Sequence, residues 1–459
     1  MADSSSSPQT QPLITHNNSN HPPPRPRKDF SRALSHARDE LHSFRSCLHY
    51  LCIDHNANHP YPNDDRWVTF RSWFVFVLLS IVVPFFSHFF VSCEGRCKDD
   101  PRHLQPYDAI VQLSLSSVAA LSFLHLSRLL RDPGLRTTLL FDQLIHESRA
   151  VNQNYTQQLD KSLRICTVIV LPCFIADSAY KIWWYTSGSP QIPFIGNAIA
   201  GIIVACLLEL LSWLYRTTLF FLVCVLFRLN CYLQLLRLRE FARTFELKPS
   251  KVPSDPSTVL DGHWRVRQQL KIISHRFRVF ILWSLILITM SQFASLLVTT
   301  KSHADVNLFN AGELALCSMT LMAGLTIILR SATKITHKAQ EITSLAAAWH
   351  AGITVILFGS DAETPAYQDG NARFLDIVNG DSDCEGLPNE EDDAANDKGA
   401  YVDTPVLVQK RQAVVKYLEN NRAGITVYGF TLDRTWLQLI FGIELSLVLW
   451  LLGKTVGIS

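Results

Sequence analysis

The most informative part of the chain is Gly424-Ile425-Thr426-Val427-Tyr428-Gly429-Phe430-Thr431-Leu432-Asp433-Arg434, which precedes an apolar run from Thr435 to Leu452. The run is long enough to cross a bilayer, since about 20 apolar residues in a helix span the hydrocarbon core. Glu444 lies in its middle. A carboxylate at this depth costs at least about 2.5 kcal/mol, so it normally faces a protein interior or water. The sequence therefore predicts a membrane helix with one acid that needs a partner.

The rest of the chain has the composition of a multi-pass membrane protein. Of 459 residues, 48% are hydrophobic and only 18% charged, with 10 tryptophans and 26 phenylalanines. Seven apolar blocks are long enough to span a membrane. They are approximately 73–92, 107–127, 165–184, 194–227, 280–300, 308–329 and 436–456. The fourth block contains no turn signal, so we expect one long tilted helix there.

Lys and Arg residues concentrate in alternate connections between these blocks. Residues 228–279 contain eleven of them, whereas residues 185–193 carry no charge. Because cytoplasmic loops are enriched in Lys and Arg, this pattern predicts a cytosolic N-terminus and, after seven crossings, an extracellular C-terminus. The first 66 residues have no apolar core of a signal peptide, so the first span is expected to direct insertion.

The predicted fold is an all-α membrane protein with five parts. Residues 1–28 are expected to be a disordered tail. Residues 29–66 are a cytosolic amphipathic segment, which either lies on the membrane surface or packs on the helical core. Residues 67–358 contain transmembrane helices one to six, with helices four to six extended into a cytosolic bundle. Residues 359–403 are expected to be a disordered acidic loop, and residues 404–459 a cytosolic helix followed by the seventh span.

The segment before the last span resembles a receptor superfamily. Tyr428, Gly429, Phe430, Asp433 and Arg434 are similar to the Gly/Phe-Phe-x-hydrophobic-Asp-Arg lead-in of the last helix in insect gustatory and odorant receptors, a superfamily of seven-transmembrane ion channels. The whole chain looks most like plant gustatory-receptor-like membrane proteins of unknown function. Within the last span the chain departs from the animal receptors, because it lacks their Tyr and Gln. The resemblance therefore implies the architecture of this chain, but it does not imply its gating chemistry.

The resemblance implies a homotetramer whose seventh span lines a central pore. Glu444 and Gln438 are then pore candidates, because acidic and polar side chains attract cations. Leu437, Phe441 and Val448 are candidates for a hydrophobic constriction on the face that also carries Glu444. In the alternative, Glu444 pairs inside one subunit with a Thr, Ser or Arg of a neighbouring helix, and the stripe is ordinary helix packing.

A ligand pocket among spans two to six is also implied by the resemblance. The intramembrane acids Asp177, Glu209 and Glu313 are candidates for its polar groups, and Trp183 and Trp184 for its aromatic walls. The alternatives stay open: structural ion pairs for the acids, and an interfacial aromatic belt for the tryptophans.

Other chemistry is sparse. Asp177 has Lys181 four residues later, which is the spacing of a helical ion pair. Cys93 and Cys97 lie in a loop predicted to be external, where their spacing permits a disulfide without requiring one. The sequence contains no hydrolase elbow, P-loop, dinucleotide fingerprint or metal-binding spacing. We therefore expect neither an enzyme nor a cofactor or metal.

Two functions remain open at this point. One is a homotetrameric ligand-gated cation channel or chemoreceptor-like membrane protein with a pore lined by the seventh span. The other is a non-conducting multi-pass receptor or scaffold, or a carrier, that signals through its cytosolic bundle. The expected partners are the lipid bilayer, further copies of the chain, a small-molecule ligand and cations, but no nucleic acid. We expect the protein in the plasma membrane rather than in an endomembrane.

Overall fold

The structure is a computed structural model that describes residues 62–90, 107–131, 149–188, 198–245, 255–300, 308–358 and 405–456. Each of these segments contains a helix long and apolar enough to cross a membrane, which confirms the seven predicted spans. The predicted amphipathic segment up to residue 61, the Cys93–Cys97 loop and the acidic loop 359–403 lie outside the described residues.

The spans follow the chain in order. The first span comprises α3 (Pro62–Val77), the π-helical segment η1 (Leu78–Val82) and α4 (Val83–Phe90). The second and third spans are α5 (Asp108–Arg131) and α8 (Arg149–Gly188). The fourth to sixth are α9 (Ala198–Ala242, followed by the 3-10 turn η4, Arg243–Phe245), α10 (Pro256–Thr300) and α11 (Leu308–Phe358), and after α13 (Pro405–Asn420) the seventh is α14 (Arg434–Val456).

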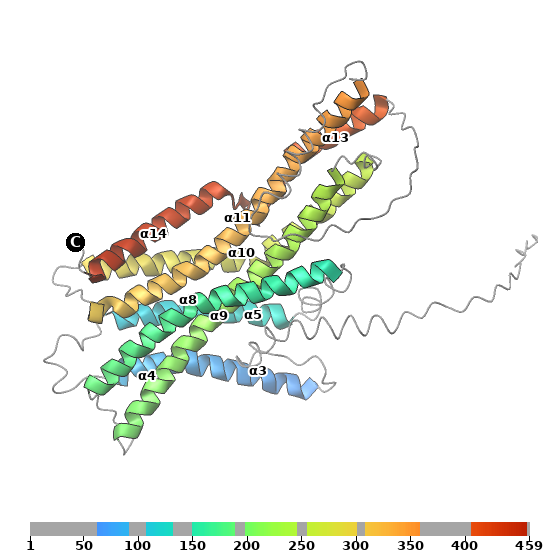
Figure 1. Ribbon diagram of the computed structural model, residues 1–459. Helices are drawn as coiled ribbons and strands as arrows, with labels where there is room; N and C mark the ends of the chain where they lie inside the picture. Colours follow the sequence, from blue (N-terminus) through green and yellow to red (C-terminus); the bar gives the residue numbers. More distant parts are fainter. Residues whose placement is uncertain are drawn as a thin grey trace, which may run out of the picture.

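Three helices are much longer than a membrane is thick. α9 and α10 have 45 residues each and α11 has 51, so each is at least about 65 Å long at about 1.5 Å per residue. The hydrocarbon core is only about 30 Å thick. Their extensions gather with α13 at one end of the molecule (Figure 1) and form what we call the distal bundle, residues 228–245, 255–279, 330–358 and 405–420. The predictions of a single long fourth helix and of extended helices four to six are confirmed.

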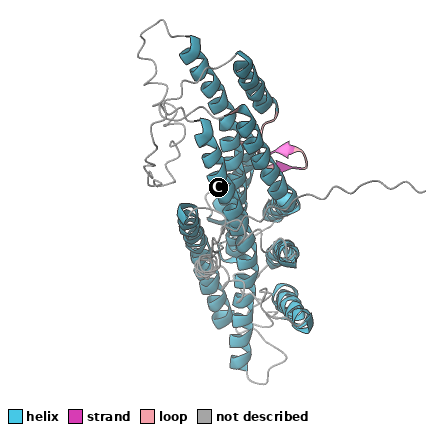
Figure 2. Cartoon of the chain, turned by 90° about the vertical axis from the view of Figure 1, so that its right-hand side faces the viewer, coloured by secondary structure: helices cyan, strands magenta, loops and turns pink. Residues whose placement is uncertain are grey.

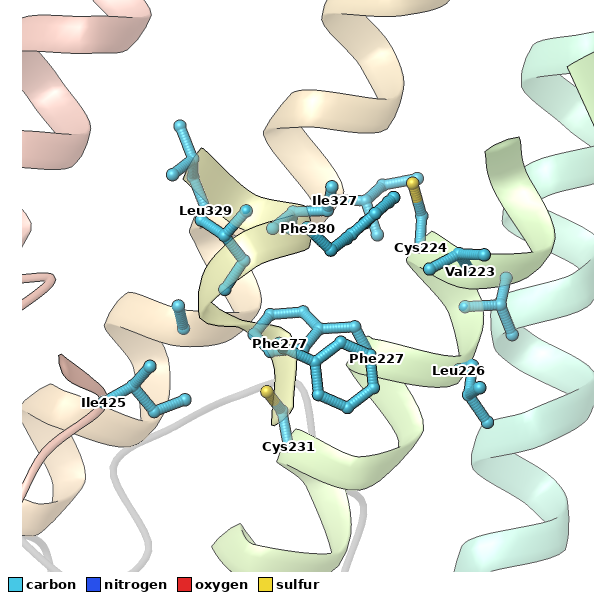
Figure 3. Packing of buried hydrophobic residues seen from close by; sticks show 14 of the residues in the cluster. Val223, Cys224, Leu226, Phe227, Cys231, Phe277, Phe280, Ile327, Leu329 and Ile425 are labelled. Carbon is cyan, nitrogen blue, oxygen red and sulfur yellow. The ribbon is translucent and has the colours of Figure 1, made fainter. Parts of the chain in front are cut away.

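α9 is the central helix. Its most apolar 18-residue window is 89% buried, compared with 22% for α8 and 17% for α14. It packs against α5, α8, α10 and α11. Near the start of the distal bundle, Phe227 of α9 meets Phe277 of α10 with ring centroids 5.0 Å apart, and Phe280 lies beside them (Figure 3). The core is thus continuous from the spans into the distal bundle.

A π-helical segment in the first span was not predicted. It lies just before Pro84, which has no backbone N–H to donate to the carbonyl four residues earlier, that of Ser80. Ser116 of α5 donates its hydroxyl to this carbonyl at 2.7 Å. Ser212 of α9 donates to the adjacent carbonyl of Leu79 at 2.6 Å. Serines from two other spans therefore satisfy carbonyls that the irregular helix leaves free.

A short hairpin precedes α14 (Figure 2). Its strands β1 (Thr426–Val427) and β2 (Phe430–Thr431) pair antiparallel across a two-residue turn. Both turn residues have positive φ, 49° at Tyr428 and 91° at Gly429, which is the type I′ geometry that matches the twist of paired strands. The lead-in motif of the sequence is therefore a tight hairpin.

Candidate functional site

The hairpin is fixed to the two long helices beneath it. The backbone N–H of Ile425 donates to Thr336 Oγ1 of α11 at 3.2 Å, and that of Thr426 donates to Ser274 Oγ of α10 at 3.1 Å. The side chain of Ile425 is fully buried. The segment before α14 is thus attached to the helices that continue into the distal bundle.

The motif residues serve this attachment and the start of α14. Asp433 Oδ1 accepts from the N–H of Arg434 at 2.7 Å, and the Asp433 carbonyl accepts from the N–H of Leu437 at 3.2 Å, as at a helix N-terminus. The guanidinium of Arg278 lies over the Tyr428 ring, 5.0 Å from its centroid. The residues that carry the family resemblance therefore set the position at which α14 begins.

The inner face of α14 packs on α10 and α11. Glu444, Val448 and Leu451 are buried on it, and Leu437 packs partly against the core. Glu444 Oε1 accepts a hydrogen bond from Thr289 of α10 at 2.5 Å. Within one chain, Glu444 is thus paired with a threonine of a neighbouring helix, as in the second of the two interpretations that the sequence left open.

The outer face of α14 is exposed in the single chain. Gln438, Gly442 and Ser446 follow one another at four-residue intervals along it, and Gly442 has no neighbouring atom within 4 Å of where a Cβ would lie. The predicted stripe of Leu437, Phe441, Glu444 and Val448 is divided, because Phe441 is 37% exposed. At about 100° per residue, Phe441 lies about 60° from Glu444, at the edge of the contact with α10 and α11.

A second group of predicted residues converges on one ammonium group. Lys181 Nζ of α8 lies 3.8 Å from Asp177 Oδ2, 3.2 Å from Glu209 Oε1 of α9 and 3.3 Å from Glu313 Oε1 of α11. All four residues are at most 8% exposed. The spacing had predicted the pair of Asp177 and Lys181, which is present, but sequence reasoning missed Lys181 as the centre. A signal existed, because Lys181 is the cation inside the third apolar block.

Glu209 is the best-partnered acid of this cluster. Ser87 of α4 donates to its Oε1 at 3.1 Å, and Tyr185 of α8 donates to its Oε2 at 3.0 Å. Trp184 is also buried and meets the Tyr185 ring edge-on at 5.0 Å between centroids. Trp183 is only partly buried. The two tryptophans therefore occupy different environments, and Trp184 is the one beside the charged groups.

A polar network continues from this cluster into α5. Arg216 of α9 is 1% exposed and donates to the Ser116 hydroxyl at 3.2 Å and to the Gln112 carbonyl at 3.4 Å. Asp108 accepts from Gln112 at 2.8 Å and lies 2.8 Å from His88 Nδ1. Five helices thus contribute charged or polar groups to one interior region. Within the part of the chain that is described, no three His, Cys, Asp or Glu side chains are placed to hold a metal ion.

Known structures share this architecture. A structure of the insect olfactory receptor OR5 from Machilis hrabei in complex with eugenol aligns with a TM-score of 0.51 and 13% identity, over 93% of this chain and 99% of the receptor. A second structure of that receptor aligns with a TM-score of 0.54 and 11% identity, over 91% and 99% respectively. At such identities the likeness shows a common fold. The narrower resemblance to plant gustatory-receptor-like proteins stays a prediction.

Sequence comparison shows the family directly. No curated protein matches the chain in sequence. One family model, described as "Protein of unknown function (DUF3537)", matches residues 39–443, which is most of the chain. With its seven membrane-spanning helices and insect-olfactory-receptor fold, this protein is a member of the DUF3537 family.

Proposed function

We propose that this protein is an oligomeric, ligand-gated cation channel, with α14 of each subunit lining a central pore. The fold shared with an insect olfactory receptor supports a receptor or channel in the membrane. A homotetramer, a cytosolic N-terminus and a plasma-membrane location belong to the same proposal, as does a role that is not enzymatic.

The observation that carries the proposal is the outer face of α14. Thr435, Gln438, Gly442 and Ser446 all lie there, exposed, within an arc of about 80° at about 100° per residue. Polar side chains inside a membrane span rarely face lipid, because they lose hydrogen bonds with water there. Small residues also allow helices to approach closely. This stripe is therefore best accommodated by water in a pore or by other copies of α14.

The same geometry changes which residues are expected to meet the ions. Glu444 lies two residues from Gly442, or about 200° around the helix, and is bonded to α10. We propose that Gln438 and Ser446 line the conduit, and that Glu444 holds α14 in orientation. Large apolar side chains flank the stripe, among them Leu439, which is 56% exposed.

Disulfide cross-linking tests whether the stripe faces other subunits. Ser446→Cys in the full-length protein is expected to form oxidised dimers, because equivalent positions approach one another near a symmetry axis. Val168→Cys is a matched control, since Val168 is 67% exposed and lies on α8, which packs against α9 and α11. A monomer by native mass spectrometry, or cross-linking at neither Gln438→Cys nor Ser446→Cys, would contradict the proposal.

Cation flux tests whether the assembly conducts. The purified protein is reconstituted into liposomes loaded with potassium, and flux is compared between wild type and Gly442→Trp. The open space around Gly442 means that the single chain accommodates the indole, so loss of flux with unchanged thermal stability is expected. A stable tetramer without flux in the wild type would instead favour the non-conducting receptor or scaffold.

A further inference from the structure

The charges around Lys181 do not balance. Asp177, Glu209 and Glu313 carry three negative charges when ionised, whereas Lys181 and Arg216 carry two positive charges, so one negative charge is left over. All five residues are at most 8% exposed. An uncompensated charge in an interior of low dielectric constant is strongly unfavourable, and it is normally removed by a proton or a bound cation.

The three carboxylates differ in how well they are partnered. Glu209 accepts hydrogen bonds from two hydroxyl groups and lies 3.2 Å from the ammonium of Lys181. Glu313 lies 3.3 Å from the same ammonium. Asp177 is fully buried, lies 3.8 Å from it, and accepts a hydrogen bond at neither oxygen. Asp177 is therefore the acid least able to remain ionised.

The other titratable groups bordering the cluster do not supply the missing positive charge. They come from α4, α5, α8, α9 and α11, and they are His88, Asp108, Tyr185, Cys206 and Cys317. His88 is 2.8 Å from Asp108, so any charge it carries offsets that carboxylate. The tyrosine and the two thiols are neutral when protonated.

We propose that this cluster is a proton-binding site that holds one exchangeable proton, distributed between Asp177 and Glu313, each of which has a buried oxygen that accepts no hydrogen bond. The described residues offer no set of three ligands for a metal ion, which favours a proton over a metal. Asp177 and Glu313 belong to α8 and α11, and both contact Lys181, so occupancy of the site alters how these helices hold together. A proton site of this kind is independent of whether α14 lines a pore.

The sign of its effect on stability follows from linkage. A buried carboxyl that binds its proton more tightly in the folded than in the unfolded state stabilises the fold while protonated, and this stabilisation is lost as pH rises. In wild-type protein in detergent, the melting temperature is expected to fall as pH rises from about 5 to about 9. Asp177→Asn keeps the shape and removes the charge, so it should abolish this fall and raise the melting temperature at alkaline pH.

Two further variants separate this site from other buried groups. Glu444→Gln neutralises the buried acid on α14, which accepts a hydrogen bond from Thr289, and is expected to flatten the pH slope less than Asp177→Asn does. Lys181→Met removes the central cation, so the melting temperature should fall more steeply at alkaline pH. If Asp177→Asn does not yield folded protein, Glu313→Gln can be used instead. It also removes one of the three negative charges of the cluster, so it should flatten the slope equally.

Infrared spectroscopy detects the proton itself. The carbonyl band of a protonated carboxylic acid is expected in wild type near neutral pH, and it should be weakened more in Asp177→Asn or Glu313→Gln than in Glu444→Gln. The proposal is overturned if Asp177→Asn and Glu313→Gln both keep the wild-type pH slope and the wild-type band. It is equally overturned if only Glu444→Gln removes them.

Discussion

Replacing Gly324 by alanine tests how closely α9 and α11 pack against each other. Gly324 lies on α11 against α9, and a Cβ there would be 2.1 Å from Cε1 and 2.6 Å from Cζ of Phe220. Carbon atoms in contact are about 3.5 Å apart, so the ring must move by about 1.4 Å. Phe220 is 2% exposed and cannot swing into solvent.

The magnitude follows from two opposing terms. Alanine is better than glycine in a helix by about 1 kcal/mol. Overpacking a close-packed interior costs about 1 to 3 kcal/mol, and a displacement of this size lies at the upper end. The net effect of Gly324→Ala is therefore expected to be about 2 kcal/mol of destabilisation, seen as a melting temperature a few degrees below wild type in detergent.

A matched control and a rescue complete the experiment. Gly312 is on the same helix but has no atom within 4 Å of a built Cβ, so Gly312→Ala should leave the melting temperature equal or slightly higher. Phe220→Leu shortens the obstructing side chain, so the double variant should be less destabilised than the sum of the two single changes. The close contact of α9 and α11 is refuted if Gly324→Ala and Gly312→Ala melt alike.

Three further outcomes concern the polar contacts between helices. Thr336→Val should destabilise the protein by about 1 to 3 kcal/mol, because the buried N–H of Ile425 loses its acceptor; hydrogen exchange at that amide checks it. Gly429→Ala should cost about 1 to 2 kcal/mol from its φ of 91° alone, since space there is open, and an unchanged melting temperature would contradict the hairpin. Ser212→Ala should cost about 1 kcal/mol of stability, because the carbonyl of Leu79 loses its donor. Thr167→Ala is the control and should stay near wild type, because the exposed Thr167 hydroxyl donates to the Leu163 carbonyl of the same helix.

The number of the spans and the length of the fourth were predictable because they depend on local composition. Long apolar blocks define the helices, and the absence of a Pro-Gly or Asn-Gly turn signal in residues 194–227 correctly predicted one continuous α9. The extensions into the distal bundle were predictable for the same reason, since helical apolar spacing continues beyond each block.

The partners of the buried polar groups were not predictable from local sequence. Thr289 and Glu444 are 155 residues apart, and Ser87 and Glu209 are 122 apart. Nothing in the spacing along one helix indicates which face meets another helix. For this reason the sequence did not predict that Phe441 would be exposed while Glu444 and Val448 are buried on the same helix. It identified Lys181 only as the neighbour of Asp177.

The hairpin and the π segment were missed for a different reason. Tyr428 takes a positive φ that is uncommon for a bulky residue, so the turn lacks the usual Asn-Gly signal. The carbonyls that the π segment leaves free before Pro84 are bonded by Ser116 and Ser212, which are supplied by other helices.

The opposed faces of α14 limit how this helix moves. Rotation about its own axis would carry Glu444 away from Thr289 while turning Gln438 toward the neighbouring helices, so the hydrogen bond of Glu444 would be lost as the exposed Gln438 became buried. Baring a carboxylate to lipid costs at least about 2.5 kcal/mol. A tilt about the end anchored at Asp433 keeps both faces in place. In a symmetric assembly, such tilting would change the distance between the α14 helices of neighbouring subunits. The same face of each helix would stay turned toward the symmetry axis.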